Sequence, residues 1–338
     1  MLNKKRLTIA VGIIISIIFL AGSFYKVDFH EFFLSLRRIT IYSLLLCMFF
    51  ICLSYVARTF MWRITTLSMK KISLSTLFGG IVVGCMVNGV LPFRAGELFR
   101  AQYLSSMTGL RRTSAISTIF IERIMDINSL GCLLVLSFLL GIHGLSQRIV
   151  GIVLLIWLII VVAVTLLIIN SEKLEKNSHK LTFVPQRLLE ISFHFLAPLN
   201  QLRDVNKIIY LVLMSLFSWI FTYLSLFALI YHSGIIMKYE AALLLFLFVN
   251  LGFLIPAAPG ALGVLQLAFW LSLSRFGVPK EQALALSFAY LFVAYILNTG
   301  VGLPFFLRAH LWAQRKIVHD EQQTRDVVSN NVEGPELK

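Results

Sequence analysis

The sequence is poor in charged residues for its length. Only 14% of its 338 residues are Asp, Glu, Lys or Arg, whereas soluble domains hold about a quarter. Hydrophobic residues make up 58% of the chain, and the mean hydropathy is +0.86. A single apolar segment would not raise the average over the whole chain. The composition therefore excludes an ordinary soluble domain and predicts an all-α polytopic membrane protein.

Sequence signatures of metal, cofactor and covalent chemistry are missing as well. There is no Cys-x-x-Cys pair, no His-Glu-x-x-His, no P-loop, no dinucleotide fingerprint and no Gly-x-Ser-x-Gly elbow. The four cysteines lie in apolar runs, where they act as small hydrophobes. We therefore expect no metal, no cofactor and no enzymatic activity.

Six apolar segments are long enough to cross a bilayer, which needs about 20 residues for each helix. They run approximately over 7–24, 41–63, 113–141, 148–170, 207–231 and 281–307. The first follows the basic stretch "NKKR" but lacks a small-residue cleavage site, so we expect a retained helix. Arg58 lies toward the inner end of the second segment, where we expect it to extend to the membrane surface.

The distribution of basic residues orients these segments. With the N-terminus inside, 19 of the 30 Lys and Arg residues fall in cytoplasmic segments and seven in outer ones. This asymmetry predicts a multi-pass protein of the cytoplasmic membrane with both termini in the cytoplasm. The net charge of +14 then reflects basic loops beside anionic lipid, and no nucleic-acid partner is expected.

Two further apolar regions are interrupted by Pro and Gly. Region 72–108 breaks at Pro92 and Gly96, and region 239–275 breaks at "IPAAPG", before Gly263. We predict two re-entrant helical hairpins with their tips at membrane depth, giving eight or more membrane segments. Each region could instead be a pair of full spans, and the basic-residue count fits both arrangements. The predicted tip residues are Pro92, Gly96, Pro259, Gly260 and Gly263.

The two hairpin regions align with each other. Pro92 and Gly96 match Pro259 and Gly263 at an offset of 167 residues, and each hairpin is followed by a short polar linker and a long apolar segment. The repeats cover about 72–141 and 239–307. Three predicted crossings separate the hairpins, so the second would enter from the opposite face. This pattern predicts an inverted-topology repeat, an architecture common among secondary transporters.

Charged residues concentrate in the first repeat. Arg94, Glu97 and Arg100 recur at intervals of three, and Glu122, Arg123 and Asp126 follow in "IFIERIMDIN". We expect Arg94 or Arg100 to pair with Glu122 or Asp126, and Arg123 to pair with Glu97, because an unpaired charge at membrane depth costs from about 3 kcal/mol upward. The pairs form either a structural latch or a polar cavity for a charged or zwitterionic head group, and the two are compatible. The forked guanidinium group of an arginine suits phosphate, because it can donate two parallel hydrogen bonds to the phosphate oxygens.

The second repeat is nearly neutral, so we expect it to act as a gate or counter-wall. Its polar residues and one from the first hairpin are candidates for a polar wall: Asn88, Asn250, Gln266 and Asn298.

The membrane domain is predicted to cover residues 1–311. Within it, segment 181–206 is amphipathic and lies either on the inner leaflet or against the protein. Residues 312–338 form a polar cytoplasmic tail, which we expect to be disordered.

The motifs "LPFRAGELFRAQYLSSMTGLRRTSAISTIFIERIMD" and "IPAAPGALGVLQLAFWLSLSRFGVPKEQALALSFAY" resemble the two signature regions of the lysylphosphatidylglycerol synthase/flippase transmembrane-region family. The resemblance covers about residues 7–310. Eight residues of the first motif match the family: Pro92, Arg94, Gly96, Glu97, Arg100, Glu122, Arg123 and Asp126.

The second motif departs from the family pattern. A Gly-Gly pair is replaced by Ala261-Leu262 before Gly263, a glutamate is replaced by Gln266, and an arginine is missing around Tyr290–Leu291.

The resemblance implies a flippase without the soluble synthase domain of the bifunctional members. The expected substrate is a phospholipid, glycolipid or polyprenyl-linked lipid with an anionic or zwitterionic head group. The alternative is a non-transporting membrane partner of a lipid-modifying enzyme or glycosyltransferase. The oligomeric state stays open.

Overall fold

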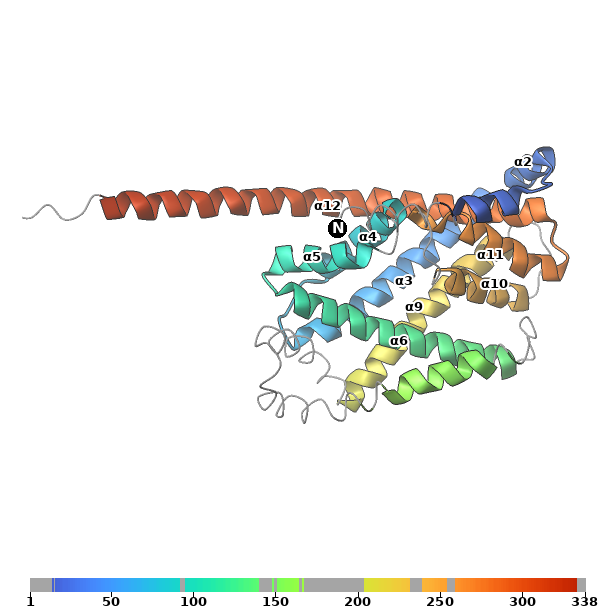
Figure 1. Cartoon of the computed structure of the whole chain (residues 1–338), viewed down its shortest axis with the longest axis horizontal. Helices are drawn as coiled ribbons and strands as arrows, with labels where there is room; N and C mark the ends of the chain where they lie inside the picture. The colour runs from blue at the N-terminus through green and yellow to red at the C-terminus, as the bar shows by residue number, and fades with distance from the viewer. Residues whose placement is uncertain are drawn as a thin grey trace, which may run out of the picture.

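The computed structural model describes residues 14, 16–91, 95–139, 148, 151–163, 166, 204–231, 239–253 and 259–332. Over these residues the chain is helical and contains no β-strand, as the composition predicts. The main helices, labelled in Figure 1, are α2 (Phe29–Arg37), α3 (Ile41–Leu67), α4 (Leu74–Val90), α5 (Gly96–Thr108), α6 (Arg112–Leu139), α9 (Val205–Tyr231), α10 (Tyr239–Gly252), α11 (Val264–Leu273) and α12 (Lys280–Val332). The short 3₁₀ turns η2 (Pro259–Ala261) and η3 (Ser274–Phe276) flank α11.

Three of the described helices are long and apolar enough to cross a membrane: Ile41–Leu67, Val205–Tyr231 and Lys280–Trp312. They coincide with three of the six predicted spans. Helix α6 is just as long, with 28 residues, but it carries Glu122, Arg123 and Asp126 near its middle. The predicted segment 148–170 contains a shorter apolar helix, Gly151–Ala163, and the start of the first predicted span lies outside the described residues. The number of crossings therefore stays a prediction.

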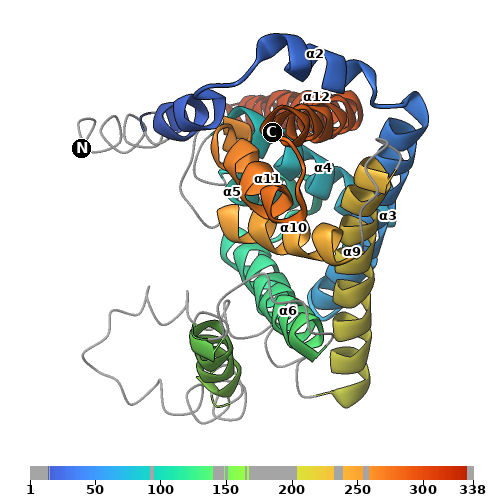
Figure 2. The same ribbon diagram turned by 90° about the vertical axis from the view of Figure 1, so that its right-hand side faces the viewer.

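Helices α3 and α9 lie side by side through the body of the molecule (Figures 1 and 2). Hydroxyl groups link them: Ser54 Oγ lies 3.0 Å from Ser218 Oγ and 3.1 Å from Thr222 Oγ1. A similar bond of 2.8 Å joins Ser129 on α6 to Ser215 on α9. Small hydroxyl residues allow close helix approach inside a membrane and satisfy each other there. This packing holds α3, α6 and α9 as one unit.

Helices α4 and α5 form the first predicted hairpin and approach very closely. A Cβ added at Gly96 would collide with the carbonyl oxygen of Gly84, so glycine is required at this crossing. The Gly96 N–H donates to Asn88 Oδ1 at 2.8 Å, which satisfies a backbone donor at the start of α5. Residues 92–94, including the predicted tip residue Pro92, lie outside the described residues.

The second hairpin, α10 and α11, uses a comparable device at its tip. Gly260 and Gly263 adopt positive φ values of 67° and 85°, a conformation that favours glycine. The Gly263 N–H donates to Gln266 Oε1 at 2.7 Å. In both hairpins, a side-chain amide therefore accepts a hydrogen bond from a glycine at the turn. Whether the hairpins are re-entrant stays a prediction.

The two hairpins also end alike. Gly109 follows α5 with φ of 75°, and Gly277 follows η3 with φ of 74°, so each hairpin leaves through a left-handed glycine. Gly109 and Gly277 lie 168 residues apart, one residue more than the offset of the predicted repeat. The long helices that follow, α6 and α12, run in opposite directions across the molecule (Figure 1).

The end of the chain differs from its sequence prediction. Helix α12 continues past Trp312 to Val332 and projects beyond the body (Figure 1), where we expected a disordered tail. The polar segment contains no Gly or Pro between Pro304 and Gly334, so nothing in the sequence stops the helix earlier. The predicted amphipathic segment 181–206 lies almost entirely outside the described residues.

We predict that Gly96→Ala destabilises the protein because the new methyl group meets the Gly84 carbonyl oxygen. Overpacking of this kind costs about 1–3 kcal/mol, and it should lower the apparent melting temperature of the purified protein in detergent. Gly300→Ala is the matched control, because a Cβ there has no neighbour within 4 Å. An exposed helical glycine gains about 0.5–1 kcal/mol on replacement by alanine. Equal melting temperatures for the two variants would contradict the close crossing of α4 and α5.

Candidate functional site

A cavity of about 490 Å³ lies between the two hairpins. It is lined by Gly96 from the first hairpin and Gly260 from the second, and α3, α6, α9 and α12 contribute the remaining walls. The polar and charged residues that line it include Arg58, Asn88, Glu97, Arg100, Glu122, Arg123, Asn250 and Asn298. The structure thus brings most of the predicted site residues from the two hairpin regions and the helices around them to one cavity.

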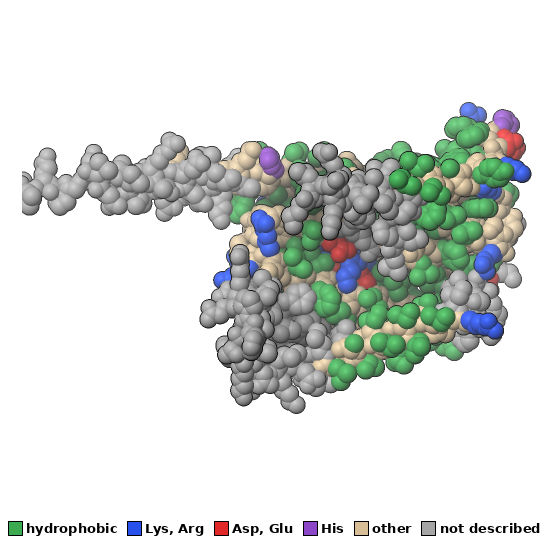
Figure 3. Space-filling view, in the orientation of Figure 1, with side chains coloured by type: hydrophobic (Ala, Val, Ile, Leu, Met, Phe, Trp, Pro, Cys, Tyr) green, Lys and Arg blue, Asp and Glu red, His purple; other side chains and the backbone are tan. Residues whose placement is uncertain are grey.

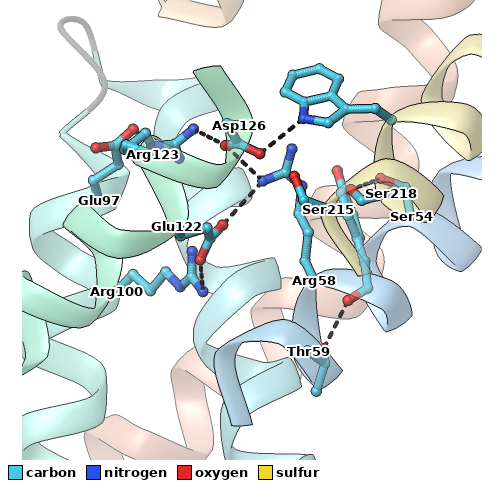
Figure 4. Close-up of polar contacts among 12 residues, drawn as sticks. Ser54, Arg58, Thr59, Glu97, Arg100, Glu122, Arg123, Asp126, Ser215 and Ser218 are labelled. Carbon is cyan, nitrogen blue, oxygen red and sulfur yellow. Dashed lines mark hydrogen bonds and ion pairs between the residues drawn. The ribbon is translucent and has the colours of Figure 1, made fainter. Parts of the chain in front are cut away.

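Glu122 on α6 is the most deeply buried charge of the site, with 1% of its surface exposed. Arg58 on α3 donates to its Oε1 at 3.1 Å. Arg100 on α5 forms an ion pair with its Oε2 at 2.6 Å. Two arginines from different helices therefore neutralise one buried carboxylate (Figure 4). An isolated carboxylate in this position would carry a large desolvation cost.

Asp126 lies one helical turn further along α6 and continues the network. Its Oδ2 accepts from Arg58 at 3.1 Å and from Arg123 at 2.9 Å. Its Oδ1 accepts from the indole nitrogen of Trp219, on α9, at 3.0 Å. Both carboxylate oxygens are therefore satisfied, and the network links α3, α5, α6 and α9 (Figure 4).

Tryptophan rings hold two of the arginines. The guanidinium of Arg100 lies 3.7 Å from the centre of the Trp62 ring, and that of Arg58 lies 5.1 Å from the Trp219 ring. Trp62 is itself fixed, because its Nε1 donates to Thr118 Oγ1 at 2.9 Å. Cation–π contacts gain strength where water is excluded. The positions of the arginine forks are therefore set by both charge and stacking.

Arg123 and Glu97 form the accessible edge of the site. Their side chains lie 3.0 Å apart and are 34% and 28% exposed, far more than Glu122. In the space-filling view, a small group of acidic and basic side chains is visible on a largely apolar face (Figure 3). The pair joins α5 to α6 at the point where the charged network reaches the protein surface.

The predicted pair of Arg123 with Glu97 is present, and of the alternatives left open for Arg94 and Arg100 the structure contains Arg100 with Glu122. Arg94 lies outside the described residues. Our expectation for Arg58 was wrong: its side chain points inward to two carboxylates and is only 15% exposed. The available signal was Ser54, one turn before Arg58, which marks a polar stripe on α3. The sequence interpretation also missed Trp62 and Trp219.

The predicted polar wall divides into two roles. Asn88, Asn250 and Asn298 line the cavity, whereas Gln266 is fully buried, does not line the cavity and binds the hairpin backbone. Tyrosines complete this wall. Tyr55 donates to Asn298 Oδ1 at 2.7 Å, and Tyr295 donates to the Gly89 carbonyl at 2.7 Å, which connects α12 to the first hairpin.

The site combines a charged wall with a neutral one. In the described part of the chain, three arginines face three carboxylates within the network, so its formal charge is zero. No group of three or more His, Cys, Asp or Glu among the described residues is arranged to hold a metal ion. Such an arrangement is suited to binding a polar group in an apolar setting.

Comparisons with known proteins agree with the motifs. The family model described as "Lysylphosphatidylglycerol synthase TM region" matches residues 8–302. Among curated proteins, the "UPF0104 membrane protein MJ1595" of Methanocaldococcus jannaschii is 23% identical over 68% of this chain and 73% of its own length. A second protein of that organism, "UPF0104 membrane protein MJ1078", is 23% identical over 65% of this chain and 92% of its own. A "UPF0104 membrane protein" of Methanothermobacter thermautotrophicus is 22% identical over 66% and 71%.

We predict that Glu122→Gln destabilises the protein much more than Glu97→Gln. Removing one partner of a buried ion pair costs about 3–5 kcal/mol, and Glu122 serves two buried arginines. Glu97 is more than a quarter exposed, so its pair contributes about 0–1 kcal/mol. Thermal unfolding of both variants in the same detergent measures the difference. Equal losses would show that the network does not depend on Glu122.

Proposed function

Because the chain belongs to the lysylphosphatidylglycerol synthase TM region family, we propose that it moves a lipid head group across the membrane through the cavity between its hairpins. The observation that carries this proposal is the cavity itself, which places charged side chains inside a membrane protein in which only 14% of the residues are charged. Charges at membrane depth are costly and usually serve a polar pathway. A lipid head group is a polar cargo that must cross an apolar layer.

The surroundings of the cavity suit the rest of a lipid. Leu91 lines the cavity and is also 37% exposed, so the cavity wall continues onto the outer surface there. Val90 and Leu98, beside it in the first hairpin, are 64% and 65% exposed. A head group held by the arginines would leave its acyl chains against these apolar side chains. Head group and tails would then cross together without burying the tails in the protein.

The inverted repeat is part of this proposal. Its support is the meeting of both hairpins at one cavity, their common left-handed exit glycines, and the opposite directions of α6 and α12 (Figure 1). In transporters built this way, one repeat moves against the other around a central site. The first repeat would hold the head group through its arginines, and the neutral second repeat would close over it.

One observation favours a second function. The polar end of α12 projects beyond the body of the protein (Figure 1), as a docking element for another protein would. In this case the chain is a membrane partner of a lipid-modifying enzyme or glycosyltransferase and transports nothing. The charged network would then act only as a latch between α3, α5 and α6.

Lipid movement in reconstituted vesicles separates the two functions. Vesicles containing fluorescent phospholipids are treated with an impermeant quencher, and the loss of inner-leaflet fluorescence reports transport. We expect the wild-type protein to accelerate movement and Ala294→Trp to return it to the rate of protein-free vesicles, because Ala294 lines the cavity. Thr299→Trp is the matched control, since Thr299 is exposed on the same helix and does not line the cavity. A folded wild-type protein that moves no lipid supports the partner function instead.

Accessibility of the hairpin tips tests the topology. In a variant without its native cysteines, single cysteines at Leu91 and Leu262 are exposed to an impermeant thiol reagent from each side of the membrane. We expect no labelling of Leu91→Cys from the outer side and none of Leu262→Cys from the cytoplasmic side, because each tip stops at membrane depth. Cysteines at Lys71 and Arg275, in the flanking segments, are the positive controls for the two sides. Free labelling of a tip from the far side would establish a full crossing.

A further inference from the structure

The charged network has more unused hydrogen-bond donors than acceptors. Both oxygens of Asp126 and the Oε1 of Glu122 accept hydrogen bonds, and Glu122 Oε2 lies in the ion pair with Arg100 Nη2 without a hydrogen bond of its own. On the donor side, the Nε groups of Arg100 and Arg123 and the Nη2 of Arg100 are buried, and no hydrogen-bond partner exists for them in the described part of the chain. Both arginines line the cavity, and Arg100 is only 5% exposed. A buried guanidinium donor without a partner calls for an acceptor.

The net charge of the network limits which chemical group can serve as that acceptor. Three arginines and three carboxylates give the described network no net positive charge. A dianionic phosphomonoester would therefore bring two uncompensated charges into the cavity, whereas a phosphodiester brings one. A primary ammonium group would bind less favourably than a phosphodiester, because the buried carboxylates are already paired with arginines and Glu97 is paired with Arg123. The network thus favours a monoanion with several oxygen acceptors.

The neutral wall supplies a matched donor and acceptor. Asn298 Oδ1 accepts from Tyr55, and within the described part of the chain the amide N–H groups of Asn298 have no partner. Asn250 Nδ2 donates to the Phe246 carbonyl, and its Oδ1 has no partner among the same residues. Both residues line the cavity. A hydroxyl group both donates and accepts, so a polyol or sugar head group would satisfy the two amides, while an ammonium group offers donors only.

We propose that the cavity takes a monoanionic phosphodiester lipid whose head group carries hydroxyl groups and no ammonium. The phosphodiester oxygens would accept from the arginine forks, and the hydroxyls would bind the amide wall. This inference rests on the proposed transport function and narrows it to one class of substrate.

The test compares four lipids that carry the same fluorescent acyl chain. Phosphatidylglycerol has a hydroxylated phosphodiester, phosphatidylethanolamine and lysylphosphatidylglycerol carry an ammonium, and phosphatidic acid is a phosphomonoester. We expect phosphatidylglycerol to move about tenfold faster than the other three, equivalent to about 1.4 kcal/mol of discrimination. Equal or faster movement of an ammonium lipid or of phosphatidic acid would overturn the inference and leave the transport function intact. If no lipid moves, the transport function fails and the inference with it.

A charge-changing variant tests the electrostatic part directly. Glu97→Gln removes one negative charge and leaves Arg123 paired with Asp126, so the network becomes net positive. We expect the transport rate of phosphatidic acid relative to phosphatidylglycerol to rise about tenfold, or about 1.4 kcal/mol. Glu31→Gln on α2 is the control, because Glu31 is exposed and does not line the cavity. An unchanged ratio in a Glu97→Gln protein that melts like the wild type would overturn the proposal.

Discussion

The burial of Glu122 is the constraint on which the rest of the site depends. A carboxylate at 1% exposure inside a membrane protein requires cationic partners, and Arg58 and Arg100 supply them from two other helices. Their positions are in turn held by the rings of Trp219 and Trp62. The first hairpin, α3 and α9 are therefore arranged around one side chain of α6. Burying an ion pair adds little net stability by itself, which favours a role beyond holding helices together.

The backbone similarity of the two halves contrasts with their chemistry. Each hairpin uses a side-chain amide to accept from a glycine N–H, Asn88 in the first and Gln266 in the second. Among the residues that the structure describes, however, the ion pairs around the cavity come from α3, α5 and α6. The second hairpin contributes glycine backbone and the amide of Asn250. One wall of the cavity is charged and the opposite wall is neutral, so a bound head group would have a defined orientation.

Several parts of the site could be predicted because they depend on local spacing. The sequence breaks around Pro92 and Pro259 interrupt apolar runs that are otherwise long enough for membrane helices. The structure has helix ends on both sides of each break, with α4 ending at Val90, α5 starting at Gly96, α10 ending at Gly252 and α11 starting at Val264. Charges at intervals of three and four residues share a helix face, and the cost of unpaired charge in a membrane predicted that the two charged faces meet. This was enough to pair Arg123 with Glu97, but it left open whether Arg94 or Arg100 reaches Glu122 or Asp126. The inward direction of Arg58 was not predictable in this way. Its partners lie 64 and 68 residues away, and the one local signal, Ser54 a turn earlier, does not identify the residues that Arg58 meets.

The sequence by itself determined the helical membrane class, the two interrupted apolar regions and the concentration of charge between residues 94 and 126. These follow from composition, from the backbone limits of Pro and Gly, and from the cost of charge in an apolar layer. The tertiary structure decided which arginines reach Glu122, that tryptophans stack on them, and that both hairpin tips line one cavity. Such contacts depend on how helices distant in the chain rotate and pack against each other. Helix packing depends on how the side chains along one whole helix face fit those of another, and a local sequence pattern does not specify this fit.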